Sequence, residues 1–374
     1  MAVYLDNAAT TPMAHEVVAV MCEHLANSFG NPSSSHSFGR QAKGLLETSR
    51  RNIAKHLNCD AKELIFTSGG TEADNMAINI AIHALGVKRI ITSEIEHHAV
   101  ELTAKIQCEK NGIELIMLDV DHSGNIDYAQ LERLLSDKAP TFVSLMHANN
   151  ELGTLLDMKR VGAMCREHGA YFHSDTVQTM GHYAFDLKEL PVDFITCAAH
   201  KFHGPKGVGF LYVNSRIKTI PMILGGAQER NFRGGTENLI GIVALSKAFD
   251  LAYEDLFGHQ SYVQGLKTYF IEKLQALVPG VKFNGRTEPD HSLYTVLNVS
   301  FPPSEKSGML LFVLDLKGVA CSGGSACSSG SNVGSHVLTG IGADPNRPSI
   351  RFSFSRYTTQ EELDFALNVI VNSL

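Results

Sequence analysis

Lys201 is the residue of this sequence best placed to form a covalent bond with a ligand. It lies in the segment AHKFHGPKGVG (199–209), with His200 before it and a glycine-rich turn after it. The short apolar run before this segment, VDFITCA, is expected to be a strand that delivers the lysine at its end. A primary amine held in this way can bind a carbonyl cofactor as a Schiff base.

A second motif could bind an anion. The run ELIFTSGGTEADNMAI (63–78) is typical of a strand, a glycine turn and a helix, and Thr71 with Asp74 three residues later fits a capping box. Backbone N–H groups at such a helix start, with the Thr71 hydroxyl beside them, can hold a phosphate. Taken alone, the motif also fits an ordinary capped helix.

Two further motifs offer groups that could bind an aromatic ring. In HSDTVQ, Asp175 ends an expected strand, where a buried carboxylate can keep a pyridine nitrogen protonated, and Gln178 could donate to a phenolic oxygen. In SEIEHHAV, His97 and His98 open an expected helix, where an imidazole could stack on a ring and shuttle a proton. Taken alone, Asp175 fits a turn residue or helix cap better, and the two histidines fit surface or capping residues better.

The elements that must position these residues follow from short apolar runs that alternate with helix-period segments. The expected strands are ELIFTS near 63, RIITS near 89, ELIMLDV near 114, TFVSLMH near 141, AYFHSD near 170, DFITCA near 193 and VGFLYV near 208. Because these runs lack a period of two, they predict a sheet buried on both faces. We therefore expect an α/β fold with a mainly parallel seven-stranded sheet.

The C-terminal third has a different pattern. Apolar residues recur at helical spacing through 242–256 and 263–277, whereas the runs near 294–301 and 349–354 alternate as strands with one packed face do. We expect a large domain of residues 14–255 and a smaller α+β domain made of residues 1–13 and 256–374.

Composition excludes several classes of protein. The chain has 374 residues, is 44% hydrophobic and carries a formal charge of −7, which argues against nucleic acid or an anionic membrane as the main partner. The longest apolar runs are too short to span a bilayer, and no targeting segment is recognisable. Seven scattered cysteines without a C-x-x-C pair indicate a reducing compartment, so we expect a cytoplasmic protein.

Taken in order, the motifs resemble the cysteine desulfurases of the NifS/IscS kind, within the class V aminotransferases and the fold-type I pyridoxal 5'-phosphate (PLP) enzymes. The matching stretches are YLDNAATTP, FGNPSSSHSFGR, FTSGGTEADN, EHHAV, MHANNELG, HSDTVQ, HKFHGPKGVG, RGGTEN, SGGSACSSG and SIRFSFSRYTT. They run nearly from end to end of the chain.

The resemblance implies how the cofactor ring would be bound. Lys201 would form the Schiff base with PLP, and His97 would stack on the ring. Asp175 would pair with the ring nitrogen, and Gln178 with the phenolic oxygen.

The resemblance also implies a site for the substrate carboxylate, which Asn150 of HANNELG and Arg351 of SIRFSF would bind. The sequence supports the role of Arg351 independently. Ile350, Phe352 and Phe354 share one face of an expected strand, and Arg351 lies on the other. From the residues alone, a surface arginine is the alternative.

A phosphate site and a dimer follow from the same resemblance. Gly70, Thr71 and His200 would hold the phosphate, joined by Thr236 from a second subunit, which implies a homodimer. One position departs from the family pattern, because Ala198 stands where a serine is usual, three residues before the lysine. The lost hydroxyl could weaken cofactor binding by roughly 1–3 kcal/mol unless another donor replaces it.

A mobile nucleophile distinguishes desulfurases from aminotransferases, and Cys327 is the candidate. It lies in CSGGSACSSGSNVGS, where ten of the fifteen residues are glycine or serine. The resemblance implies that Lys201 takes the α-proton of L-cysteine, that Cys327 receives the sulfur as a persulfide, and that His97 manages the proton at the substrate thiol. The acceptor would be an iron–sulfur scaffold, a sulfur-carrier protein or a tRNA thiolation factor. Cys321, six residues earlier, could be structural or a redox partner.

Other functions remain open from the sequence. A selenocysteine lyase or a class V aminotransferase would use the same Lys201 chemistry, and a carrier that has lost activity is conceivable given Ala198. A metal-binding module is the alternative without PLP, but the spacing of histidines and cysteines offers no set of ligands, so we expect no metal.

Overall fold

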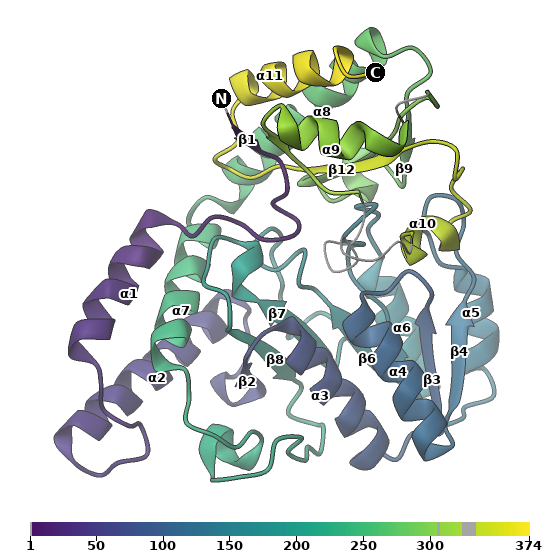
Figure 1. Ribbon diagram of the computed structural model, residues 1–374. Coiled ribbons are helices and arrows are strands. Elements are labelled where there is room, and N and C mark those ends of the chain that lie inside the picture. Colours follow the sequence, from purple (N-terminus) through teal and green to yellow (C-terminus); the bar gives the residue numbers. More distant parts are fainter. Residues whose placement is uncertain (1, 305–306, 324–333) are drawn as a thin grey trace.

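The computed structural model describes residues 2–304, 307–323 and 334–374. Among these residues, seven strands form the central sheet in the order β2-β8-β7-β6-β5-β3-β4 (Figure 1). Their bounds are β2 (Leu64–Thr67), β3 (Arg89–Ser93), β4 (Glu114–Leu118), β5 (Thr141–Ser144), β6 (Tyr171–Asp175), β7 (Phe194–Ala198) and β8 (Gly209–Val213). Strand β8 is antiparallel to both neighbours, and the other pairs are parallel. The expected seven-stranded, mainly parallel sheet is confirmed.

Both faces of this sheet are buried, as the apolar runs predict. Neighbouring residues of one strand contribute to different hydrophobic clusters, as Phe142 and Val143 do on β5 and Phe194 and Ile195 do on β7. One cluster includes helices α1 (His15–Asn27), α2 (Ser37–His56) and α7 (Leu239–Glu254), and the other includes α3 (Gly70–His83) and α4 (His98–Asn111). Because each strand must be apolar on both sides, a period of two is absent from its sequence.

The helices of the chain cover the sheet and the C-terminal part. Their bounds are α1 (His15–Asn27), α2 (Ser37–His56), α3 (Gly70–His83), α4 (His98–Asn111), α5 (Tyr128–Leu135), α6 (Met158–His168), α7 (Leu239–Glu254), α8 (Leu256–Leu277), α9 (Leu310–Leu316), α10 (His336–Gly340) and α11 (Gln360–Val371). None of the helices in the described part of the chain combines the length and apolar character needed to cross a membrane.

The C-terminal part has a sheet and a hydrophobic cluster of its own. Strands β9 (Lys282–Asn284), β10 (Val296–Ser300) and β12 (Ser349–Ser353) form an antiparallel sheet, and β1 (Val3–Tyr4) pairs with β11 (Val319–Ala320). Val3 and Leu5 pack with residues of this sheet and of α8 and α11. Figure 1 shows the purple N-terminal strand lying beside the green and yellow C-terminal elements. The exact division into residues 14–255 and the remainder stays a prediction.

The strand ends position the candidate site. Parallel strands end at the same edge of a sheet, and here β6 ends at Asp175 while β7 ends just before the lysine turn Ala199–Lys201. The N-terminus of α3 follows β2 at a glycine turn, and His97 follows β3. The fold therefore brings motifs that are far apart in the sequence to one edge.

Candidate active site

A single cleft collects the predicted site residues. Its walls are formed by Ala8, Ala9, Gly70, Thr71, Asp74, His97, Met146, Asn150, Asp175, Val177, Gln178, Ala198, His200, Lys201 and Arg351. Every predicted site residue except Thr236 and Cys327 is among them. The residues come from the central sheet, the N-terminal segment and β12, so the cleft depends on the folding of the whole chain.

Lys201 lies on a turn that the N-terminal segment encloses. The residue belongs to a short 3-10 turn after β7, three residues beyond the end of the strand. Its Nζ donates to the carbonyl oxygens of Ala8 at 2.6 Å and Ala9 at 3.0 Å. Thr11 binds the same turn, because its N–H and its hydroxyl both donate to the carbonyl of His200 at 2.9 Å. Residues 8–11 thus hold both the amine and the backbone of the lysine turn.

Two buried carboxylates form the floor of the cleft. Asp175 is 5% exposed, and burial together with the charge of Asp74 raises the pKa of its carboxyl to about 7. Burial likewise raises the pKa of Asp74 to about 7, and its Oδ1 has no hydrogen-bond partner among the described residues. Two carboxylates in one dry site cannot both ionise easily, so the cleft favours a cation here.

The structure corrects the expected capping box of Thr71 and Asp74. Helix α3 begins at Gly70, its N-cap is Gly69 with φ +153°, and no side chain caps it. Asp74 lies one turn inside the helix and faces the cleft, with Oδ1 3.5 Å from Nε2 of the buried His173. The prediction failed because the chain enters the helix through a turn at Gly69, and no side chain in the described part of the chain accepts from the first backbone N–H groups.

His97 caps helix α4 and keeps its ring in the cleft. Its Nδ1 accepts a hydrogen bond from the N–H of Ala99 at 3.1 Å, so Nε2 carries the ring proton. Burial, followed by the positive charge of Lys201, lowers the pKa of His97 to about 4. The imidazole is therefore neutral near pH 7 and offers an N–H donor to a ligand.

The anion-binding end of the cleft is formed by the start of α3 and by His200. A Cβ atom on Gly70 would meet Cγ2 of Val177 at 2.7 Å, so a glycine is required for this approach. The Nδ1 of His200 lies 3.1 Å from the Thr10 hydroxyl. Ala198 lines this wall without a hydroxyl, and the Thr196 hydroxyl, a possible substitute, is hydrogen-bonded to His173 at 3.1 Å.

A guanidinium group also lines the cleft. Arg351 is only 1% exposed, which excludes the alternative of a surface arginine. Its Nη1 donates to the carbonyl of Asn150 at 2.9 Å and its Nη2 to Oδ1 of Asp6 at 2.8 Å. Its Nε has no partner among the residues described. The apolar residues of the other strand face pack in the hydrophobic cluster behind it, as the alternation predicts: Ile350, Phe352 and Phe354.

Gln178 is also anchored to the N-terminal segment. Its Nε2 donates to the carbonyl of Ala8 at 3.0 Å, the same oxygen that binds the lysine amine. The sequence reasoning missed Ala8 and Ala9 as site residues because backbone carbonyls have no residue-specific signal. The only signal for them is the motif YLDNAATTP as a whole.

The two remaining predicted residues are not in the cleft. Thr236 lines a separate cleft with Arg233, Gly235 and Asn238, so within one chain it does not reach Lys201. Cys327 lies outside the described residues. Cys321 is described, and burial raises the pKa of its thiol to about 12, which makes it a poor nucleophile at neutral pH.

Two groups of possible metal ligands occur among the described residues: Asp74, His97 and Asp175 in the cleft, and His98, Glu101 and His336 outside it. In the second group, the Glu101 carboxylate already accepts from His98 at 3.1 Å and pairs with Lys105. The imidazoles of His98 and His336 are stacked with their centroids 4.2 Å apart. Hydrogen bonding and stacking account for this arrangement.

Comparisons with known proteins agree over almost the whole chain. The family model Aminotransferase class-V matches residues 3–365. Cysteine desulfurase IscS of Dictyoglomus turgidum is 44% identical over 372 residues, which cover 98% of this chain and 93% of the relative. A solved NifS-like protein is 34% identical with a TM-score of 0.91, and the match covers 100% of this chain and 99% of that one. A structure of SspA in complex with cysteine is 31% identical with a TM-score of 0.81, covering 96% and 100% of the two chains. The chain belongs to the aminotransferase class-V family.

Proposed function

We propose that this protein is a PLP-dependent cysteine desulfurase, which converts L-cysteine to L-alanine and retains the sulfur on Cys327. The observation that supports this most is the cleft in which Lys201, Asp175, His97 and Arg351 meet. The relatives named cysteine desulfurase and the SspA structure with bound cysteine support the same substrate.

The residues present fit PLP at three points. The buried carboxyl groups of Asp175 and Asp74 favour a positively charged group beside them, and a protonated pyridine nitrogen is such a group. Helix α3 begins at Gly70, which lines the cleft, and the N–H groups of a helix start can hold a phosphate. The amine of Lys201 lies in the same cleft, held by two carbonyl oxygens. When bound, PLP supplies an electron sink for the charge that develops at the substrate α-carbon.

The protein groups then have distinct tasks. Lys201 would hold the cofactor through its amine and would take the α-proton of the substrate. Arg351 and Asn150, which both line the cleft, would bind the substrate carboxylate. His97 would stack on the ring, and its Nε2–H would donate to the sulfur of the substrate thiol, which is its part in handling the thiol proton. Gln178 donates to the phenolic oxygen, and Thr71 and His200 bind the phosphate.

Cys327 performs the sulfur transfer. Its thiolate attacks the sulfur of the substrate, an S–S bond forms, and the Cβ–S bond of the substrate breaks. The electron pair of the broken bond stays with the carbon skeleton, which takes up one proton at Cβ, recovers a proton at the α-carbon and leaves as alanine. The persulfide on Cys327 is then passed to an iron–sulfur scaffold or a sulfur-carrier protein.

The same proposal includes the assembly and location of the protein. Thr236 of a second subunit completes the phosphate site of a homodimer, which accounts for its distance from Lys201 within one chain. Residues 14–255 form the cofactor-binding domain, and residues 1–13 and 256–374 form the smaller domain with the Cys327 loop. The enzyme works in the cytoplasm.

The decisive experiment supplies L-cysteine and a reductant and measures alanine and sulfide together. Wild type produces both, Cys327→Ser produces neither, and Cys321→Ser serves as the matched control that retains activity. Lys201→Ala loses the visible absorbance of bound PLP. Equal alanine from Cys327→Ser would show that this cysteine is not the sulfur acceptor.

The remaining activities are distinguished by the same assay. Faster turnover of selenocysteine than of cysteine would indicate a selenocysteine lyase, and a keto acid formed without sulfide would indicate an aminotransferase. A colourless protein that takes up no added PLP would refute the proposal as a whole.

A further inference from the structure

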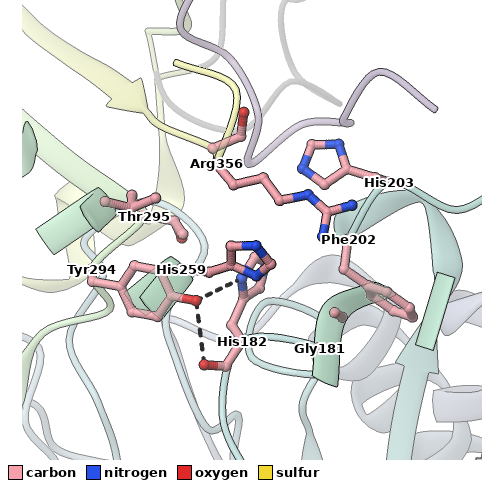
Figure 2. Close-up of a pocket in the computed structure, with 11 residues that line it drawn as sticks. Gly181, His182, Phe202, His203, His259, Tyr294, Thr295 and Arg356 are labelled. Atoms are coloured by element: carbon pink, nitrogen blue, oxygen red, sulfur yellow. Dashed lines mark hydrogen bonds between the residues drawn. The ribbon is translucent and has the colours of Figure 1, made fainter. Parts of the chain in front are cut away.

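A small pocket adjoins the lysine turn and shares no lining residue with the cofactor cleft. It is lined by residues of distant segments, among them His182, Phe202, His203, His259, Tyr294 and Arg356 (Figure 2). Phe202 and His203 directly follow Lys201 in the chain, so the pocket adjoins the backbone that carries the lysine. None of these residues has a part in the proposed reaction.

His182 joins this pocket to the lysine itself. Its Nε2 lies 3.2 Å from the carbonyl oxygen of Lys201, and its Nδ1 lies 3.0 Å from the hydroxyl of Tyr294. A carbonyl can only accept, so Nε2 carries the ring proton and Nδ1 accepts from the tyrosine. Figure 2 shows the Tyr294 hydroxyl directed at both the ring and the main-chain carbonyl of His182, the second contact being 3.3 Å.

The surroundings keep this imidazole in one state. Burial, with the positive charges of Arg356 and His259 acting in the same direction, lowers the pKa of His182 to about 4. The ring is therefore neutral near pH 7, and its tautomer is fixed by the two hydrogen bonds. Arg356 is itself held in place by the carbonyl of Leu251 at 2.9 Å.

The partners of His182 belong to opposite parts of the fold. Its own segment follows β6, which ends at Asp175, and both Asp175 and the later Gln178 line the cleft. Tyr294 is 2% exposed and packs in the hydrophobic cluster of the C-terminal sheet. The chain of hydrogen bonds therefore connects the C-terminal part to the main chain of the lysine.

We propose that His182, oriented by Tyr294, is a positioning residue for Lys201. The lysine carbonyl lies at the end of a three-residue 3-10 turn, and a donor at this point fixes the peptide plane that follows the lysine. Fixing this plane fixes the direction in which the side chain leaves the backbone, and hence the reach of Nζ into the cleft. The inference rests on the proposed function, in which Lys201 forms the bond to PLP.

The test measures how fast the lysine combines with added PLP, without any substrate. Apoenzyme is mixed with PLP, and the growth of the visible absorbance band and the fraction trapped by borohydride are recorded. His182→Leu removes the donor and is expected to slow the reaction at least tenfold. His182→Gln keeps an N–H near the position of Nε2 and is expected to remain within threefold of wild type. Tyr294→Phe leaves the imidazole in place without its orienting hydroxyl, and a two- to fivefold slowing is expected.

A matched control separates positioning from stability. His147 is another half-buried histidine whose pKa burial lowers to about 4, but its ring contacts the Thr179 hydroxyl at 2.9 Å instead of the lysine. His147→Leu is expected to lower the melting temperature without slowing the reaction with PLP. Wild-type rates in both His182→Leu and Tyr294→Phe would overturn the inference. If His182→Leu does not fold, the rate measured for Tyr294→Phe decides the question. A wild type that never forms the band would instead refute the proposed function.

Discussion

Ala198→Ser tests whether the phosphate lies where the start of α3 meets the end of β7. The side chain of Ala198 lines the cleft, and its Cβ is 3.7 Å from the place that a Cβ on Gly70 would occupy. A serine hydroxyl would therefore point into the space beside the helix N-terminus. We expect the substitution to tighten the binding of PLP.

The size of the gain follows from the charge of the phosphate. A hydrogen bond to a charged group contributes about 1.5–3 kcal/mol net, and ordering a side chain costs about 0.5 kcal/mol or more. The difference of about 1–2 kcal/mol corresponds to a dissociation constant lowered roughly five- to thirtyfold. No substitute is evident in the described part of the cleft, because the Thr196 hydroxyl is already bonded to His173.

The assay is titration of apoenzyme with PLP, followed by visible absorbance and by melting temperature. Cys197→Ser is the matched control, since the neighbouring side chain points into the core on the other face of the same strand. It should lose stability without gaining affinity. A well-folded Ala198→Ser protein that binds PLP no more tightly than wild type would refute this placement of the phosphate.

The other predictions concern the cleft and the core. Gly70→Ala should weaken PLP binding at least tenfold in the same titration, because its Cβ would meet Val177 at 2.7 Å, whereas Gly44→Ala, with open space around it, should be neutral or stabilising by about 0.5–1 kcal/mol. Arg50→Met should lower the free energy of unfolding in urea by about 3–5 kcal/mol, because it breaks the buried ion pair between Arg50 and Glu229, whose N–O distance is 2.7 Å. A change below about 1 kcal/mol would contradict this expectation. Burial lowers the pKa of Lys267 to about 7 in the folded protein. Between about pH 7 and the usual pKa of a lysine, the unfolded chain therefore binds more protons than the folded chain, so the free energy of unfolding should rise with pH. Urea unfolding should show a gain of about 1–2 kcal/mol from about pH 7 to about pH 9, and Lys267→Met should abolish that gain.

The sheet could be predicted from the sequence because its signal is local. Each strand must be apolar on both faces, so seven short apolar runs between helical segments are sufficient to locate them. The start of helix α3 could not be predicted in the same way. Thr71 and Asp74 have the spacing of a capping box, but the chain turns at Gly69, and Asp74 is buried inside the helix. Spacing alone does not reveal which backbone conformation a pair of glycines adopts.

The candidate site likewise contains residues that could be predicted from the sequence and groups that could not. Side chains such as Asp175, His97 and Arg351 could be named because their types and motifs are specific, and the structure brings them into one cleft. The groups that hold Lys201 could not be named, because its amine binds the carbonyls of Ala8 and Ala9 and its own carbonyl accepts from an imidazole. A backbone acceptor can belong to any residue type, so only the folded chain identifies it.

The distribution of charge along the cleft explains why these groups have to be rigid. The cleft contains two carboxylates whose pKa is raised by burial, the positively charged Arg351 and the N–H groups at the start of α3. A ligand with a carboxylate, a protonated ring nitrogen and a phosphate matches these groups only if the amine of Lys201 keeps its place among them. Nζ is held by two carbonyls in front, and the main chain is held by Thr11 and His182 behind. Loosening either side would leave the charged groups in place and still misdirect the amine, so the formation of the lysine bond to PLP should be more sensitive to these contacts than the binding of PLP itself.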